Sequence, residues 1–353
     1  MKTDAHVLIC YNAPVALYEH YSGKDNRACA GADDMSESGF QEELDFFCAA
    51  ITEGFTKVTT YPVTLDISST IAFIRETKPD VIFNLVESVE GISSYEAYMA
   101  GLYELLQVRY TGNTPPVLLN CLNKNLTKSI LTGFGIKTPS YQVFHSPKDL
   151  SEKSFLLRFP VITKLLREDA SIGISENSVV HSLPDLQKQV QYLFGIYRQE
   201  VLVEEYIEGR EFNIALLNGE PLPVSEISFA GLPDGLPKIV TYEGKWIPES
   251  DYYRHTVPQC PADIDPVLAS QLQELAVKAY QALNCRDYAR VDIRVSEQGI
   301  PYVIEVNPNP DITDNSGFSR AMRAYGSTIQ EAYRKIVSFA LQRGSFDSFA
   351  RTG

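Results

Sequence analysis

Short apolar runs alternate with amphipathic stretches along the first third of the chain. The apolar runs predict buried strands, and the stretches between them, such as 40–55, carry apolar residues at helical spacing. Ser38 and Gln41 have the spacing of a capping box at the start of that helix. This alternation predicts a parallel sheet with helices on its faces. The predicted strands are 7–11, 58–61 (stopped by Pro62) and 81–85, further helices are 68–75 and 95–106, and a loop is predicted over 22–39.

The rest of the chain divides into two further units. The middle unit has a predicted helix at 117–131, strands at 141–144, 161–166 and 201–207, a polar loop at 167–177 and a helix announced by Ser182. The last unit has a hairpin at Asn218-Gly219, a long loop at 230–261, a helix at 265–283, a second hairpin and a terminal helix capped by Ser327 with Gln330. We therefore expect an α/β (α+β) protein with three domains, at 1–114, 115–203 and 204–345.

The second hairpin of the last unit divides into a polar and an apolar face. Its strands, 288–295 and 301–307, flank a turn in which Gly299 supplies the positive φ that a tight hairpin needs. A one-residue slip in pairing would destroy the division, so the register is well specified. On the polar face Asp292 opposes Glu305 and Arg290 opposes Asn307. On the apolar face Val291 opposes Val306, Ile293 opposes Ile304, and Val295 opposes Tyr302.

The polar face of this hairpin predicts a metal site. Directly opposed carboxylates, about 5 Å apart at Cβ, repel each other unless a cation lies between them. Hard oxygen donors favour Mg²⁺ or Mn²⁺, which need few protein ligands when they also carry nucleotide phosphates. The candidate ligands are Asp292, Glu305 and Asn307. The alternative is that Asp292 pairs with Arg290 or Arg294 on a solvated face.

Other polar residues have a function only if a nucleotide binds above them. Lys164 ends an apolar strand and Lys124 lies in a helix, positions that usually face solvent, but either amine could hold a phosphate. Glu204 and Glu205 would by default mark a strand end that reaches water. The segment 171–173 is too short to identify as a phosphate loop.

Composition excludes several classes of protein. The net charge is −14, from 31 basic and 45 acidic residues, and no basic cluster is present, so a nucleic-acid partner is not expected. The six cysteines and five histidines lack the spacing of a disulfide scaffold or a zinc site. No apolar run approaches the roughly 20 residues of a membrane span, and the N-terminus lacks a signal-peptide core. We expect a soluble, cytoplasmic protein with no membrane partner.

The order of these motifs resembles the ATP-grasp superfamily, and within it D-alanine–D-alanine ligase and related amino-acid ligases. The resemblance extends from about 81 to 341 and is weak across the first eighty residues. It implies a Rossmann-like N-terminal domain, a small central domain and a C-terminal antiparallel-sheet domain that clamps ATP against the central one. The segments that carry it are Lys124, Phe159-Pro-Val-Ile-Thr-Lys164, Val201-Leu-Val-Glu-Glu-Tyr-Ile-Glu-Gly-Arg-Glu211, Arg290-Val-Asp292 and Ile304-Glu-Val-Asn307.

The resemblance implies a role for each matching residue. The residues expected to hold ATP are Lys124, Lys164 and Lys245 at the phosphates, Glu204 with the backbone of Glu205 and Ile207 at the adenine edge, and Glu211 at the ribose. Asp292, Glu305 and Asn307 would hold two Mg²⁺ ions, or Mn²⁺. Arg290 would stabilise the oxyanion of a tetrahedral intermediate, and Ser316 would contact the acceptor's carboxylate. Small amino-acid or carboxylate substrates and, by analogy, a homodimer are expected.

The implied reaction has two steps. ATP would phosphorylate a substrate carboxylate, and an amine would then displace phosphate to give an amide. Water would hydrolyse the acyl phosphate, so the loops at 169–175 and 230–246 are expected to close over it as lids.

The sequence departs from the family mainly at the amino-acid end. The family's histidine segment is absent from 85–93, no acid follows the first strand, and Ala170 and Trp246 replace the serine and tyrosine of the lids. Leu165 replaces a proline, and a glycine is replaced within 307–311. Such changes alter which substrates fit, so we expect a ligase for substrates other than D-alanine, with secondary metabolism as one candidate setting. The alternatives are an authentic D-alanine–D-alanine ligase and a non-catalytic ATP-binding protein.

Overall fold

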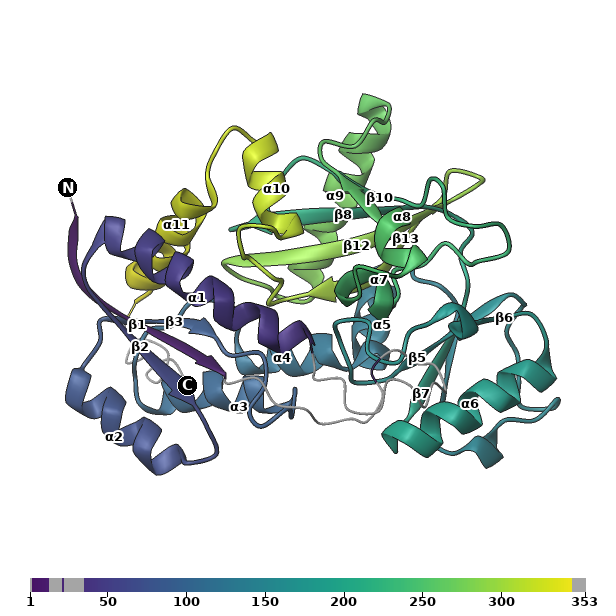
Figure 1. The fold of residues 1–353 in the computed structure, drawn as a ribbon, viewed down its shortest axis with the longest axis horizontal. Helices are drawn as coiled ribbons and strands as arrows, with labels where there is room; N and C mark the ends of the chain where they lie inside the picture. The colour runs from purple at the N-terminus through teal and green to yellow at the C-terminus, as the bar shows by residue number, and fades with distance from the viewer. Residues whose placement is uncertain (1, 13–20, 22–34, 345–353) are drawn as a thin grey trace.

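Three β-sheets with their helices follow one another along the chain. The structure, a computed structural model, describes residues 2–12, 21 and 35–344. In Figure 1 the N-terminal sheet lies at the lower left, the middle sheet at the lower right and the C-terminal sheet above both. The predicted α/β architecture is confirmed. Within the described part of the chain, no helix is long and apolar enough to span a bilayer.

The N-terminal sheet is parallel, in the strand order β2-β1-β3, as predicted. Its strands are β1 (Thr3–Asn12), β2 (Phe55–Val63) and β3 (Val81–Leu85), and its helices are α1 (Met35–Gly54), α2 (Ile67–Thr77) and α3 (Tyr95–Leu105). Pro62 does not stop β2, because an edge strand tolerates a proline on its unpaired side. The predicted cap at Ser38 is also wrong, because α1 begins at Met35. Most of the loop predicted over 22–39 lies outside the described residues.

The middle sheet is antiparallel, in the order β4-β7-β5-β6. Its strands are β4 (Tyr141–Phe144), β5 (Val161–Leu165), β6 (Val179–Val180) and β7 (Val201–Glu205), and α6 (Leu183–Tyr197) packs on it with Ser182 as N-cap, as predicted. The single helix predicted over 117–131 is two helices, α4 (Pro115–Leu122) and α5 (Lys124–Gly133). They separate at Asn123, whose extended backbone and side-chain oxygen cap α5. Lys124 is therefore the first residue of a helix.

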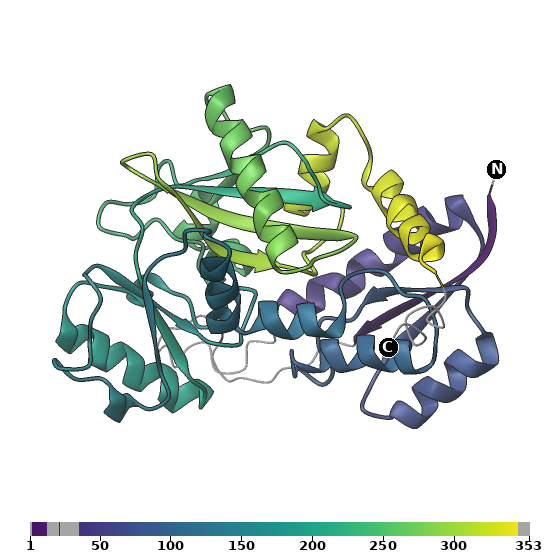
Figure 2. The same cartoon turned by 180° about the vertical axis from the view of Figure 1, so that it is seen from behind.

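The C-terminal sheet has the order β11-β10-β8-β12-β13, with β9 paired to β8. Its strands are β8 (Gly209–Leu217), β9 (Glu220–Pro221), β10 (Ser225–Ser228), β11 (Val257–Gln259), β12 (Tyr288–Ser296) and β13 (Pro301–Asn307). The helix α9 (Pro266–Ala282) lies across one face, as the view from behind shows in green (Figure 2). The region predicted as a loop over 230–261 contains α7 (Tyr242–Trp246), α8 (Asp251–His255) and β11.

The register of the β12–β13 hairpin matches the prediction only in part. Arg290, Val291 and Asp292 pair with Asn307, Val306 and Glu305, as predicted. Beyond them the register shifts by one: Ile293 pairs with Val303 and Val295 with Pro301, so the predicted partners Ile304 and Tyr302 are wrong. Ile304 is the extra residue of a bulge. It lines the central cavity, while Val303 takes the buried position against α9.

The last two helices return the chain to the N-terminal sheet. α10 (Gly317–Ala324) precedes α11 (Ile329–Gln342), and Tyr333 of α11 stacks on Phe47 of α1 at 4.6 Å between ring centroids. The N-cap of α11 is Thr328, with Glu331 completing the capping box, one residue beyond the predicted pair. The domain boundaries stay predictions. β7 extends two residues past the boundary drawn at 203.

Candidate active site

One large cavity lies where the three sheets meet. Its volume is about 830 Å³, which is in the range of cofactor and substrate pockets. Strands β5 and β7 line one side and β8, β12 and β13 the other, with residues after β3 closing one end. All twelve candidate residues line it: Lys124, Lys164, Glu204, Glu205, Ile207, Glu211, Lys245, Arg290, Asp292, Glu305, Asn307 and Ser316.

Lys124 faces this cavity rather than solvent. Its side chain is only 10% exposed, and Nζ lies 3.4 Å from Asp169 Oδ1 and 3.8 Å from Glu305 Oε1. Nζ also donates to the carbonyl oxygen of Glu168. Burial disfavours the charged amine, but the carboxylates of Glu305 and Asp169 outweigh it and raise the pKa of Lys124. The residue therefore offers a fixed positive charge inside the cavity.

Lys164 shares one buried carboxylate with a second lysine. Its Nζ lies 2.5 Å from Glu204 Oε1, and Lys128 Nζ lies 2.6 Å from Glu204 Oε2. Burial alone would raise the pKa of Glu204, but the two lysines outweigh it and lower the pKa. Glu204 is 1% exposed and its carboxylate is engaged by amines, so the strand end does not reach water.

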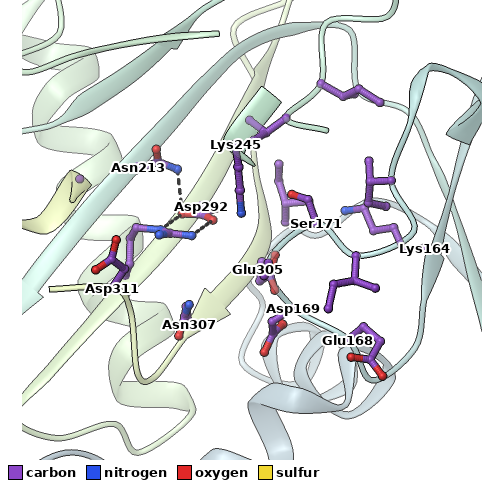
Figure 3. A pocket seen from close by; sticks show the side chains of 18 of the residues that line it. Lys164, Glu168, Asp169, Ser171, Asn213, Lys245, Asp292, Glu305, Asn307 and Asp311 are labelled. Atoms are coloured by element: carbon purple, nitrogen blue, oxygen red, sulfur yellow. Dashed lines mark hydrogen bonds and ion pairs between the residues drawn. The ribbon is translucent and has the colours of Figure 1, made fainter. Parts of the chain in front are cut away.

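On the predicted metal face Asp292 opposes Glu305, as the strand pairing predicted. The same face also contains an ion pair between Arg290 and Asp292. Arg290 Nε and Nη2 donate to the two oxygens of Asp292 at 2.8 and 2.9 Å. Asn213 Nδ2 donates to Asp292 Oδ1 at 2.8 Å, as Figure 3 shows. This ion pair between Asp292 and Arg290 is one of the two pairings that the sequence allowed as an alternative to a metal site. Its side chains line the cavity and are 13% and 23% exposed, so the face is not solvated.

The donors on this face fit a hard divalent cation. Asp292, Glu305 and Asn307 offer two carboxylates and an amide oxygen, which is the oxygen chemistry that Mg²⁺ and Mn²⁺ prefer. Across the described ranges, no three His, Cys, Asp or Glu side chains form a complete metal cage. An ion here would therefore depend on further oxygens from phosphate and water.

A third carboxylate lies beside Glu305. Burial alone would raise the pKa of Glu305. The charge of Lys124 and a hydrogen bond with Asp169 outweigh burial and lower the pKa to about 2. Burial and the neighbouring Glu305 carboxylate raise the pKa of Asp169 to about 7. In mildly acidic solution Asp169 thus holds the proton of this pair and Glu305 the charge. In Figure 3 the two side chains lie next to each other.

Two loops meet over the cavity. Trp246 Nε1 donates to the carbonyl oxygen of Ala170 at 3.4 Å, which joins the loop after β5 to α7. Lys245, its neighbour, points into the cavity between Asp292 and Lys164 (Figure 3). Burial and the charge of Arg290 lower the pKa of Lys245. This contact lies in the two segments predicted to act as lids.

The remaining predicted nucleotide contacts lie further along the same wall. Glu205 and Ile207 line the cavity at the end of β7 and just beyond it. Glu211 Oε2 lies 3.5 Å from Arg294 Nη1, and burial raises the pKa of Glu211 despite that arginine. The positions accord with the expected adenine and ribose roles, which stay predictions.

The opposite end of the cavity is polar and rich in carboxylates. Ser316 is the N-cap of α10, and its Oγ accepts a hydrogen bond from Ser319 N at 3.1 Å. Asp311 lies beside Asp292, on the side away from Lys164 (Figure 3). Glu96 accepts from Asn309 Nδ2 at 2.8 Å, and burial raises the pKa of Glu96 well above its usual value.

Several residues of the cavity were not singled out in the sequence. Lys128 lies one helical turn after Lys124, and an i, i+4 lysine pair is common on solvated helices. Asp169 lies in a polar loop, where an acid is ordinary. The structure adds Glu96, Asp169, Asn213 and Asp311 to the lining of the cavity, with Lys128 buried behind Glu204.

A nucleotide-sized cavity between two antiparallel sheets, with buried lysines on one wall and opposed carboxylates on the other, defines an ATP-grasp enzyme. The model of the D-Ala–D-Ala ligase C-terminus matches residues 130–338, which is more than half of the chain. The D-alanine–D-alanine ligase of Aquifex aeolicus is 30% identical over 76% of this chain and 84% of its own. The chain therefore belongs to the D-alanine–D-alanine ligase family, whose members are ADP-forming, ATP-dependent ligases that make C–N bonds.

Other similar proteins agree on the fold but leave the substrates open. An uncharacterized protein of Sinorhizobium fredii, y4sG, is 30% identical over 74% of this chain and 75% of its own. The crystal structure of D-alanine–D-alanine ligase from Bacillus anthracis complexed with ATP superposes with a TM-score of 0.70 and 22% identity. It covers 96% of this chain and 98% of that one. The predicted ATP-grasp fold is confirmed.

Proposed function

We propose that this enzyme joins the carboxylate of one amino-acid-like substrate to the amine of another through an acyl phosphate, and that its substrates are not two molecules of D-alanine. The observation that carries the reaction is the convergence of Lys124, Lys164 and Lys245 with the Asp292–Glu305 pair in one cavity. Lysines bind phosphates as point charges, and a buried site strengthens that attraction.

Each residue has a task in the proposed reaction. Lys124, Lys164 and Lys245 would bind the phosphates of ATP and offset the charge that moves with the transferring group. Mg²⁺ held at Asp292, Glu305 and Asn307 would neutralise further charge on the phosphates. Arg290 lies against Asp292 and would stabilise the oxyanion that forms when the amine attacks. The Trp246–Ala170 contact would keep water from the acyl phosphate.

The expectation of different substrates rests on the amino-acid end of the cavity. Asp311 and Glu96 add carboxylates there, and Asp169 adds one beside Glu305. The loops meet through an indole and a backbone carbonyl, not through two side-chain hydroxyls. A site with buried polar groups rejects a substrate that leaves them unpaired, so these residues favour substrates that can form hydrogen bonds with them.

Two other functions stay open. An authentic D-alanine–D-alanine ligase is favoured by the names of the relatives. A non-catalytic ATP-binding protein with a ligase fold is disfavoured, because such a protein has no use for two opposed carboxylates beside Arg290. A homodimer is proposed by analogy with the family alone.

The test is phosphate release from ATP with Mg²⁺ across D- and L-amino acids and other small carboxylates, singly and in pairs, with the products identified by mass spectrometry. Glu305→Gln serves as the catalytic blank, and Lys188→Met, which changes an exposed lysine on α6, serves as the matched control. We expect release that requires two substrates, and a product lighter by one water than their sum.

The outcomes separate the candidates. Release with D-alanine alone and formation of its dipeptide would identify the authentic D-alanine–D-alanine ligase and refute the substrate proposal. ATP binding without turnover across the whole panel would favour the non-catalytic protein.

A further inference from the structure

Lys128 is a fully buried lysine that none of the predicted roles uses. Its side chain is 2% exposed. Nζ lies 2.6 Å from Glu204 Oε2, donates to Thr138 Oγ1 at 2.8 Å, and lies 3.5 Å from the carbonyl oxygen of Ile304. A buried ammonium is costly unless it is paired and hydrogen-bonded, and here Nζ has one ion pair and two hydrogen-bond acceptors. Such a group has a specific role in the fold or in the site.

The charge of Glu204 connects Lys128 to the phosphate end of the cavity. Glu204 Oε1 binds Lys164 and Oε2 binds Lys128, so one carboxylate lies between two amines. If Glu204 faced Lys164 alone, the two charges would cancel within one close, buried pair. Burial lowers the pKa of Lys128, but while this lysine is charged the three side chains together retain one positive charge. Because Lys164 is 16% exposed and lines the cavity while Lys128 does not line it, that charge is available at Lys164.

The position of Lys128 also ties this charge to the other wall. Lys128 lies one turn after Lys124 on α5, so one helix carries both amines. Its third contact, the carbonyl oxygen of Ile304, belongs to the bulge residue directly before Glu305. One buried side chain thus contacts the middle sheet through Glu204 and the C-terminal sheet through Ile304.

We propose that Lys128 is a positioning residue that neutralises Glu204 and so keeps the charge of Lys164 free to bind the β- and γ-phosphates of ATP. The inference rests on the proposed phosphate role of Lys164. It assigns Lys128 no contact with the nucleotide. Its effect is therefore confined to phosphates that reach Lys164 and does not extend to the adenosine part of the ligand.

The test is a comparison of ATP and AMP affinities, measured by calorimetry for the wild type, Lys128→Met, Glu204→Gln and the double variant. AMP lacks the β- and γ-phosphates, so the ratio of the two affinities cancels any loss at the adenine edge. We expect Lys128→Met to lower the ATP-to-AMP affinity ratio about tenfold, because Glu204 then sequesters Lys164. The double variant should recover the ratio to within about threefold, because a neutral amide cannot sequester an amine.

Lys188→Met, on the exposed face of α6, is the matched control and should leave the ratio unchanged. A merely structural role for Lys128 would weaken both ligands equally, so an unchanged ratio in a folded Lys128→Met variant would overturn the proposal. A double variant with a ratio as low as that of Lys128→Met would also overturn it. If Lys128→Met does not fold, Glu204→Gln alone decides: its ratio should equal or exceed that of the wild type, and a tenfold fall would refute the inference.

These measurements need no turnover, so failure of the ligase reaction leaves them interpretable. A wild-type protein that binds neither nucleotide would refute both this inference and the proposed function.

Discussion

At the scale of single residues, the carboxylate pair Asp169–Glu305 shifts in opposite directions, with the pKa of one group raised and that of the other lowered. Both carboxyl groups lie near Lys124, which can stabilise only one negative charge fully. The pKa of Glu305 falls to about 2 and that of Asp169 rises to about 7, so the pair carries a single charge in mildly acidic solution. Ionisation of Asp169 near neutral pH therefore costs the fold some stability.

We predict that Asp169→Asn stabilises the nucleotide-free protein at pH 8 and does so less at pH 5. The folded-state pKa of Asp169 lies above its unfolded value of 3.8, so its stabilising proton is fully in place below pH 3.8 and is lost as the pH rises to about 7. The side chain is 45% exposed, and solvent screening limits the expected gain at pH 8 to about 1–3 °C in Tm. Thermal unfolding between pH 5 and 8.5 measures it.

The exposed Asp234→Asn variant controls for the general loss of one negative charge. Glu305 stays ionised throughout this pH range, so it contributes no slope of its own. A Tm difference between Asp169→Asn and wild type that does not change with pH would contradict the prediction.

The sequence shows which residues can oppose one another along a regular strand pair. It does not show which residues of separate elements come into contact. Asp292 and Glu305 could be matched because side chains in a hairpin alternate with a period of two. The pairing of Asp169 with Glu305 depends on where a loop of the middle sheet lies against the C-terminal sheet. No local pattern encodes that distance. The same is true of Lys128 and Glu204, whose contact joins a helix to a strand seventy-six residues away.

At the scale of elements, the two loops over the cavity meet through the only tryptophan in the chain. We predict that binding of ATP with Mg²⁺ changes the tryptophan emission, because ligand contacts on Lys245 alter the surroundings of the neighbouring Trp246.

We also predict that Trp246→Phe lowers kcat about tenfold, since it removes the donor to Ala170 and exposes the intermediate to water. Stopped-flow fluorescence and steady-state kinetics measure the two effects. Emission that stays constant while calorimetry detects ATP binding would refute the first.

Gly209 begins β8 at a point where no side chain fits. Its φ is +142°, and an added Cβ would lie 2.0 Å from the carbonyl oxygen of Val295 on β12. We predict that Gly209→Ala lowers the free energy of unfolding by about 3 kcal/mol or more, because β8 and β12 would have to separate in the centre of the sheet. Urea unfolding measures it.

Gly195→Ala is the matched control, because this glycine lies in α6 with open space around it. Alanine favours helix over glycine by roughly 0.5–1 kcal/mol, so the control should be neutral or stabilising. Equal stability of both variants would show that the Val295 contact can relax.

Most elements were predictable from hydrophobic periodicity, and two of the errors have a similar cause. The break at Asn123 and the bulge at Ile304 each interrupt a regular element at a position where the sequence pattern continues. A polar contact accompanies each interruption. The Asn123 side chain caps α5, and the carbonyl oxygen of Ile304 accepts from the buried Lys128 amine. Both interruptions place a residue of the site, Lys124 in one case and Glu305 in the other.

At the scale of the whole molecule, the cavity exists because the N-terminal and C-terminal sheets are held together beside it. Asp287 accepts a hydrogen bond from Gly112 N at 2.8 Å and pairs with Arg343, whose side chain also donates to the carbonyl oxygen of Tyr110. These contacts join three parts of the chain that lie far apart in sequence. Their existence follows from the topology, in which α11 returns to the N-terminal sheet, and no feature of the individual segments predicts it.

Asn113 is the central residue of this junction, and we predict that Asn113→Ala weakens both the fold and the site. Its Nδ2 donates to the carbonyl oxygens of Tyr288 and Pro308 at 3.0 and 2.6 Å, and its Oδ1 accepts from Arg286 N at 2.7 Å. Alanine would leave these buried groups unpaired, at a cost of about 2–4 kcal/mol in the free energy of unfolding. Because Pro308 follows Asn307, the loss should also lower the affinity for ATP with Mg²⁺ by more than the affinity for ATP alone.

Urea unfolding and calorimetry with and without Mg²⁺ measure the two effects, with the exposed Asn177→Ala as control. An equal loss of both affinities would mean that the junction supports the fold without positioning Asn307.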